Sequence, residues 1–139
     1  MPKKFNSPRK KLTRQELRDL DLEILFLEGV VRRDPAYVEA LQILGDNYTR
    51  RGRYGEGLQM DQRLSRLRPD DAIVYYNLAC SYSLTHQIEP AFEALHAAIA
   101  LGYRDFTALD QDPDLDNLRH HTEYKRIRAK MRGLQAKTT

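Results

Sequence analysis

Carboxylates alternate along one segment of the chain, DQDPDLDNL at residues 110–118. Such alternation occurs in calcium loops, but an EF-hand loop counted from Asp110 needs glycine at its sixth position and glutamate at its twelfth. Those positions hold Leu115 and His121. Asp112 followed by proline instead has the form of a helix N-cap with proline at the first helical position. The segment therefore predicts the start of a helix and no metal site.

The other reactive groups are a single thiol, Cys80, and four histidines. A thiol nucleophile needs a base within hydrogen-bond reach, for which His86 and His96 are the candidates. Cys80 and His86 are six residues apart, on different helix faces with a turn between them. His120 and His121 are adjacent, so on a helix they diverge and cannot share a metal ion by themselves. We interpret Cys80 as a small apolar residue.

A phosphate-binding loop is also missing from the sequence. The glycine-rich segment RRGRYGEG at residues 50–57 has no Gly-Lys-Ser/Thr ending and no preceding strand. The remaining carboxylates are distributed as helix caps and solvated faces. We predict a protein that is not an enzyme and that binds no cofactor.

Charge is distributed unevenly along the 139 residues, although the net charge is only +3. Residues 1–11 contain five Lys/Arg and no acid, and residues 119–139 contain seven Lys/Arg against one acid. The body between them, residues 12–118, has 11 Lys/Arg against 19 Asp/Glu. We expect a basic disordered arm at residues 1–12 and a basic helix and tail at residues 119–139. Either end could remain solvated or contact nucleic acid.

Cysteine usage and hydropathy indicate the compartment. The lone Cys80 cannot form an intramolecular disulfide and suits a reducing environment. No window approaches the roughly 18 apolar residues of a membrane span, and the basic first residues are not followed by a signal-type apolar stretch. We expect a cytoplasmic protein without membrane contact.

The sequence repeats itself at an offset of 34 residues. Large residues align with large ones and small residues with small ones, as a stacked core requires. The aligned pairs are Leu44 with Leu78, Gly45 with Ala79, Tyr48 with Tyr82, Gly57 with Ala91 and Leu58 with Phe92. Helical spacing of apolar residues predicts two helices in each unit, and no alternating β-branched run predicts a strand.

The expected architecture is all-α. It consists of a lone N-terminal helix at 13–35, two units at 36–69 and 70–103, and the start of a cap at 104–118. Together these form a repeat domain over residues 13–118. Thr13 and Glu16 form a capping-box pattern at the start of the first helix.

The segments LQILGDNYTRRGRYGEGL…LRP and YYNLACSYSL…AFEALHAAIALG resemble tetratricopeptide repeats (TPRs), a family with a 34-residue helix-turn-helix unit. The closing segment LGYRDFTALDQDPDLDNLRHHTEY is similar to the short capping helices of many small bacterial members. Two positions depart from the pattern: Asp61 replaces a bulky residue and His86 replaces the turn glycine. The matching positions are Leu41, Leu44, Gly45, Tyr48, Gly52, Gly57, Pro69, Tyr75, Leu78, Ala79, Tyr82, Ala91, Ala98 and Leu101.

The resemblance implies an α-solenoid of about two and a half repeats whose first helices line a concave groove that binds a peptide or helix of another protein. Tyr76 and Ile73 are the expected apolar anchors. Asn77 matches a carboxylate-binding asparagine of some relatives, but Gln42 and Asp46 replace the lysine and asparagine that accompany it, so no carboxylate clamp is expected. The partner-binding positions carried over are Glu39, Gln42, Ile43, Asp46, Arg50, Ile73, Tyr76, Asn77, Cys80 and Ser83.

The helix within residues 13–35 has more apolar surface than one face can bury. Leu22, Leu25 and Phe26 lie off its main apolar stripe. The C-terminal segment or the N-terminal arm could cover them, or they could form a homodimer or partner contact.

We predict a scaffold-type adaptor for protein–protein interaction. Two alternatives are a nucleic-acid or ribosome-associated factor, acting through the basic tails and an arginine cluster, and a structural subunit that dimerises through residues 17–31. The arginine cluster comprises Arg50, Arg51, Arg53, Arg63, Arg66 and Arg68.

Overall fold

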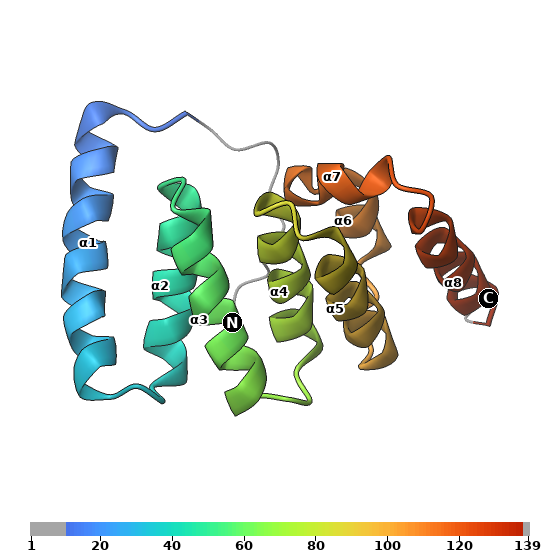
Figure 1. Cartoon of the computed structure of the whole chain (residues 1–139), viewed down its shortest axis with the longest axis horizontal. Helices are drawn as coiled ribbons and strands as arrows, with labels where there is room; N and C mark the ends of the chain where they lie inside the picture. Colours follow the sequence, from blue (N-terminus) through green and yellow to red (C-terminus); the bar gives the residue numbers. More distant parts are fainter. Residues whose placement is uncertain (1–10, 138–139) are drawn as a thin grey trace.

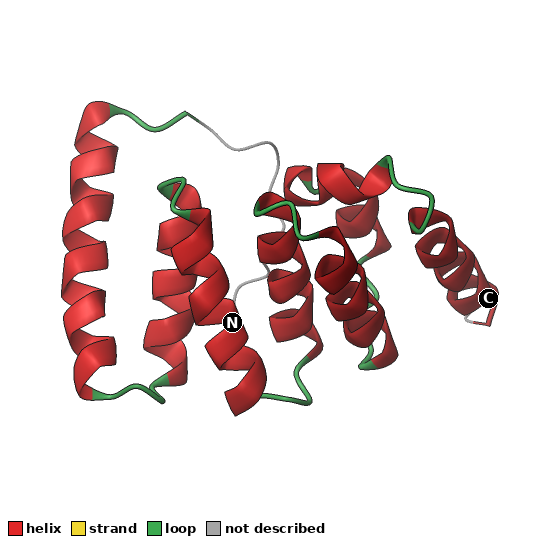
Figure 2. Ribbon diagram, in the orientation of Figure 1, coloured by secondary structure: helices red, strands yellow, loops and turns green. Residues whose placement is uncertain are grey.

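A computed structural model describes residues 11–137, which form helices joined by short turns, with no strand in that range (Figures 1 and 2). The predicted all-α class is confirmed. The elements are α1 (Arg14–Arg33), α2 (Val38–Arg50), α3 (Tyr54–Leu67), α4 (Ala72–Leu84), α5 (Ile88–Ala100), α6 (Phe106–Gln111), the 3-10 helix η1 (Pro113–Leu115), α7 (Asp116–Arg119) and α8 (Tyr124–Lys137).

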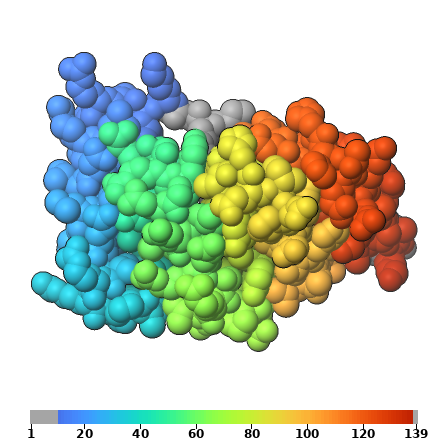
Figure 3. Space-filling view, in the orientation of Figure 1, coloured from blue at the N-terminus to red at the C-terminus, as the bar shows by residue number. Residues whose placement is uncertain are grey.

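The helices follow the 34-residue period of the sequence. α2 and α4 begin at Val38 and Ala72, and α3 and α5 begin at Tyr54 and Ile88. α2 packs against α3 and α4 against α5, while α1 contacts α2 and α3 contacts α4. The result is a row of helices with α1 at one end and α8 at the other (Figures 1 and 3).

The lone first helix is held by its cap and by one apolar stripe. The Thr13 side chain accepts from the Glu16 amide, and the Glu16 carboxylate accepts from the Thr13 amide, which is the predicted capping box. Leu20, Ile24 and Leu27 are buried in one cluster with residues of α2 and α3. This burial stabilises a helix that has no hairpin partner of its own among the described residues.

The α2–α3 pair packs closely because glycine lies at its contact. A Cβ on Gly57 would come within 2.8 Å of Thr49 Oγ1, and a Cβ on Gly45 within 3.2 Å of Met60 Cβ. The α4–α5 pair has alanine at the equivalent positions, and both alanines are fully buried.

Asp61 is accommodated by a hydrogen bond between helices. It is buried, and the Ser81 hydroxyl on α4 donates to its Oδ2 at 2.5 Å. Beside it, Gln62 Nε2 donates to the Tyr82 hydroxyl at 3.2 Å. A polar contact between α3 and α4 therefore occupies the position of Asp61, where the sequence resemblance predicts a bulky residue.

His86 replaces a turn glycine without changing the turn. Its φ is 60°, and Gly52, 34 residues earlier, has φ 84°. Each residue lies just after a helix and has a left-handed backbone conformation. This conformation is sterically unfavourable for a residue with a Cβ.

Replacing His86 with glycine should raise the free energy of unfolding by about 1 kcal/mol, because glycine adopts this φ without steric cost. Urea denaturation followed by circular dichroism would measure it. The control is Gln87→Gly, which changes the neighbouring residue and should not stabilise. A His86→Gly variant that is less stable than wild type would mean that the imidazole contact with Asn117 outweighs the relief of strain.

α6 begins where the 34-residue period would place the first helix of a third unit, but it is too short to complete that helix. α6 starts at Phe106, again 34 residues after Ala72, but ends at Gln111. Asp112 precedes proline and is extended, with φ −64° and ψ 118°. Its side chain accepts from the Asp114 amide, so the predicted N-cap and the proline at N1 are confirmed.

The chain turns at this break and lies across α4. We call residues 106–119, which comprise α6, η1 and α7, the cap; η1 and α7 contact α4, and α7 also contacts α5. The cap extends through Arg119, one residue past the predicted boundary at 118, and α8 follows from Tyr124. The Tyr124 hydroxyl donates to the Leu109 carbonyl at 2.6 Å, and Ile127 is fully buried.

Among residues 11–137, no helix has the length and apolar character needed to cross a membrane. Most of the basic arm predicted at residues 1–12 lies outside the described residues.

Candidate protein-binding surfaces

The α2 half of the predicted groove is accessible. Glu39, Asp46 and Arg50 are exposed, Gln42 is half-buried, and Ile43 is 48% exposed. These five side chains form a mixed surface with one apolar residue and both signs of charge. We call it the α2 surface.

The α4 half of the groove is closed, which contradicts the prediction for four residues. Tyr76 is 1% exposed, Cys80 and Ser83 are fully buried, and Asn77 is 8% exposed. Only Ile73 remains half-buried, at the edge of a shallow pocket between α4 and the α5–α6 turn. Tyr76 is therefore a core residue and not a peptide anchor.

The chain's own cap occupies the α4 surface. The Tyr76 hydroxyl donates to Asp112 Oδ2 at 2.5 Å, and its ring stacks on Tyr103 with centroids 4.3 Å apart. Burial raises the pKa of the Tyr76 hydroxyl, and the neighbouring Cys80 and Asp112 raise it further. Tyr76 stays protonated and can act as a donor to the buried carboxylate.

Two more cap residues hold the segment in place. Arg119 donates to the Asp112 carbonyl at 2.6 Å and to the Leu109 carbonyl at 3.0 and 3.2 Å. Asn117 Nδ2 donates to the Ser83 carbonyl on α4 at 2.8 Å. Sequence reasoning missed Asp112, Asn117 and Arg119 as contact residues. The signal was available, because the third unit starts in register and is broken by Asp112-Pro113.

Cys80, Asp112 and Asp114 bring one sulfur and two carboxylate oxygens within 4.8 Å of one another. This set fits a cation poorly, because hydrogen bonds already use the acceptor atoms of Asp112. Its Oδ2 accepts from Tyr76 and from the Cys80 thiol at 3.9 Å, and its Oδ1 accepts from the Asp114 amide. The group anchors the cap to α4.

The histidines considered as bases for Cys80 contact other residues. His86 Nδ1 lies 3.4 Å from Asn117 Nδ2. The His96 ring lies between α5 and α8, where Lys130 Nζ is 2.6 Å from its Nδ1 and Glu123 Oε2 is 3.5 Å from its Nε2. The His121 ring packs against Phe92.

His96 should make stability depend on pH. Burial lowers its pKa below the ordinary value of 6.5, and Lys130 lowers it further, against the opposing effect of Glu123. The unfolded chain therefore binds the proton more readily, so stability is full above pH 6.5 and is lost as pH falls from there toward the folded-state value. Urea denaturation from pH 7.5 to 5 should show a smaller decline for His96→Gln than for wild type. Parallel declines would contradict this role.

Part of the predicted arginine cluster pairs with acidic residues. Arg51 Nε lies 2.7 Å from Asp21 Oδ1, and Arg53 Nε lies 2.6 Å from Glu56 Oε1. The Arg53 guanidinium also stacks 4.8 Å from the Tyr48 ring. The arginines lower the pKa of the Asp21 and Glu56 carboxyls, as expected for ion pairs. Arg51 and Arg53 thus help to hold α1 and the α2–α3 turn, which weakens this cluster as a nucleic-acid site.

Leu22, Leu25 and Phe26 are 66%, 65% and 70% exposed. With Gly29 they form what we call the outer face of α1. The C-terminal segment lies at the other end of the molecule and does not cover this face (Figure 3).

α8 presents only positive charge to solvent. Its buried side is formed by Tyr124, Ile127 and Met131. The helix contains no acidic residue, and its basic residues are Lys125, Arg126, Arg128, Lys130, Arg132 and Lys137, all exposed.

The described fold is that of an all-helical protein built from consecutive helical pairs. No family model matches the chain. The chain is similar to a protein of Arabidopsis thaliana whose name describes it as chloroplastic, with 34% identity over 83 residues. The match covers 58% of this chain and 25% of the plant protein, so the chain spans about a quarter of that relative's length.

Proposed function

We propose that this protein is a TPR-type adaptor that binds another protein and catalyses no reaction. The 34-residue spacing of α2 with α4 and of α3 with α5 supports the family assignment. Helical-pair repeats bury their faces on neighbouring repeats and leave an extended surface on which partners bind. The lone buried Cys80 supports a reducing, cytoplasmic location.

The exposed α2 surface carries the proposal. Ile43 is exposed amid Glu39, Asp46 and Arg50, so an apolar anchor is surrounded by polar groups that can orient a peptide backbone. The equivalent surface on α4 is filled by the cap, so only one repeat is available. A site this short predicts weak binding, with a Kd in the micromolar range or higher.

Site-specific photo-crosslinking tests this proposal. A benzophenone amino acid at position 43 should form a protein adduct in nuclease-treated lysate of the source organism, and Arg50→Glu should remove it. The matched control places the same crosslinker at Leu101, an exposed apolar residue at the end of α5. The same adduct at both positions, or one unaffected by Arg50→Glu, would refute the α2 surface as the site.

The α8 helix supports a second candidate, a nucleic-acid-associated role, because six basic residues and no acid lie on one helix. Contacts to phosphates make binding fall steeply with salt. A fluorescent single-stranded RNA should then bind more weakly to Lys125→Gln/Arg132→Gln, with a reduced salt slope. Equal binding by wild type and variant would exclude α8.

A further inference from the structure

Four residues of the outer face of α1 have the spacing of a helix-binding site. Leu22, Leu25, Phe26 and Gly29 are at positions i, i+3, i+4 and i+7, so they are neighbours on one helical surface. This surface lies opposite the stripe through which α1 packs on α2. The three large side chains are each about two-thirds exposed.

Gly29 adds no side chain to this surface. A Cβ added at Gly29 would meet no heavy atom within 4 Å, so the space there is open. Positions i, i+3, i+4 and i+7 of one helix form the hole that receives a side-chain knob from a facing helix. Three large residues around a glycine therefore suit a helix with a bulky apolar side chain.

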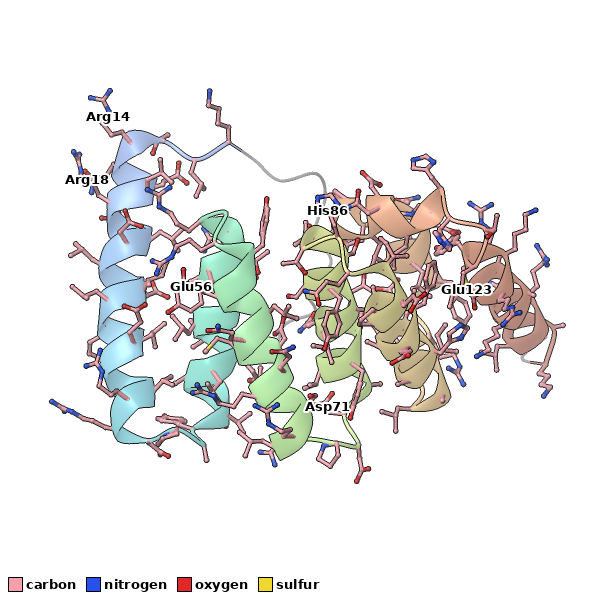
Figure 4. The ribbon with its side chains drawn as sticks, in the orientation of Figure 1. Arg14, Arg18, Glu56, Asp71, His86 and Glu123 are labelled. Atoms are coloured by element: carbon pink, nitrogen blue, oxygen red, sulfur yellow. The ribbon has the colours of Figure 1, made fainter. Side chains whose placement is uncertain are left out.

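Arginines flank the apolar centre at both ends of α1. Arg14 and Arg18 precede it and Arg32 and Arg33 follow it, all four exposed. Figure 4 shows Arg14 and Arg18 pointing away from the rest of the molecule. No ion pair within residues 11–137 involves these four side chains. The two arginine pairs are about 21 Å apart along the helix, from Arg18 to Arg32 at 1.5 Å per residue.

The acidic residues of α1 are engaged elsewhere. Asp21, Glu23 and Glu28 accept hydrogen bonds from side chains of α2 and the turn that follows it. Asp19 accepts from Gln15 at 2.8 Å, and Asp21 and Glu28 line a pocket beside Leu25, so carboxylates border the apolar centre along its sides. The charges at the two ends of the outer face are therefore positive, and the carboxylates lie along its sides.

We propose that the outer face of α1 binds an amphipathic helix of a partner protein, with an apolar centre flanked at both ends by Asp or Glu. The spacing of the arginines requires the two acidic groups of that helix to be about 14 residues apart. This surface is separate from the α2 surface and does not depend on the proposed function there.

Charge favours such a partner over a second copy of the chain. In an antiparallel dimer through this face, Arg14 and Arg18 of one copy would approach Arg32 and Arg33 of the other. In a parallel dimer each arginine would approach its own equivalent. Either arrangement opposes like charges, whereas an acidic helix pairs all of them.

Fluorescence anisotropy with two synthetic probes tests the proposal. Each probe is a labelled helix-forming peptide of about 22 residues with leucines at i, i+3, i+4 and i+7. One carries glutamate at both ends and the other carries lysine. The glutamate probe should bind wild type, and Phe26→Ser should weaken it about tenfold, which corresponds to 1.4 kcal/mol. Arg18→Glu/Arg33→Glu should prefer the lysine probe.

Matched variants separate this site from the other surfaces. Arg126→Glu reverses an exposed charge on α8 and should leave binding of the glutamate probe unchanged, as should Ile43→Asp on the α2 surface. Equal binding of both probes to wild type, or full binding by Phe26→Ser, would overturn the proposal. It would also be overturned by a dimer in sedimentation, or by binding to phosphatidylcholine/phosphatidylglycerol vesicles, that Phe26→Ser abolishes.

Discussion

Tyr76→Ala should lower the free energy of unfolding by about 3–5 kcal/mol, the usual cost of truncating a buried aromatic residue. The ring is buried and stacks on Tyr103, so its loss leaves a cavity at the contact of α4 with the cap. The substitution also removes the donor at 2.5 Å from the buried Asp112 carboxylate. This replaces the sequence-based expectation that Tyr76 is an apolar anchor for a partner peptide.

Chemical denaturation followed by circular dichroism measures this effect. Tyr76→Phe keeps the ring and should cost about 1–3 kcal/mol through the lost hydrogen bond. Ile43→Ala, on the accessible α2 surface, should change stability by less than about 1 kcal/mol. If Tyr76→Ala were as stable as Ile43→Ala, the cap would not be seated on α4 in solution.

Arg119→Leu should release the cap and cost about 2–4 kcal/mol, because three hydrogen bonds from a charged group to backbone carbonyls are lost. The Arg119 guanidinium links the Leu109 carbonyl in α6 to the carbonyl of Asp112, the residue at the break between α6 and η1. The cap would then lose the side chain that holds its bend.

Hydrogen exchange monitored by mass spectrometry would localise the change. Protection should fall in residues 106–119 and on α4, and remain in α1 and α2. Arg126→Leu is the control, since its side chain is 77% exposed and contributes little. Loss of protection that is uniform over the chain, or absent, would contradict a local role for Arg119.

The hairpins could be predicted from sequence because local signals agree there. The helical spacing of apolar residues, the turn glycine and the prolines all indicated the same boundaries. The structure places α2 and α3 within the predicted unit 36–69, and α4 and α5 within 70–103. His86 and Asp61 were the exceptions. Their accommodation depends on a backbone angle and on a partner, Ser81, that no local pattern contains.

Of the predicted groove, only the α2 half is exposed in the structure. The 34-residue alignment placed Tyr76 and Ile43 on the same groove. Such an alignment contains no information about a later segment that folds back over one of them. The cap reaches α4 because Pro113 ends α6 after six residues and Asp112 finds a donor in Tyr76. That contact joins residues 36 positions apart, beyond the reach of helical periodicity.

The core residues form two clusters that meet at the α3–α4 contact. One cluster joins α1, α2 and α3 with Val74 of α4, and the other joins α4, α5, the cap and α8 with Leu58 of α3. At their boundary the buried Asp61–Ser81 hydrogen bond contributes to the coupling between them. In a nearest-neighbour description of repeat stability, such a chain has two cooperative units joined by one interface term. Partial unfolding should then divide the molecule between α3 and α4, so that either end could open while the other remains folded.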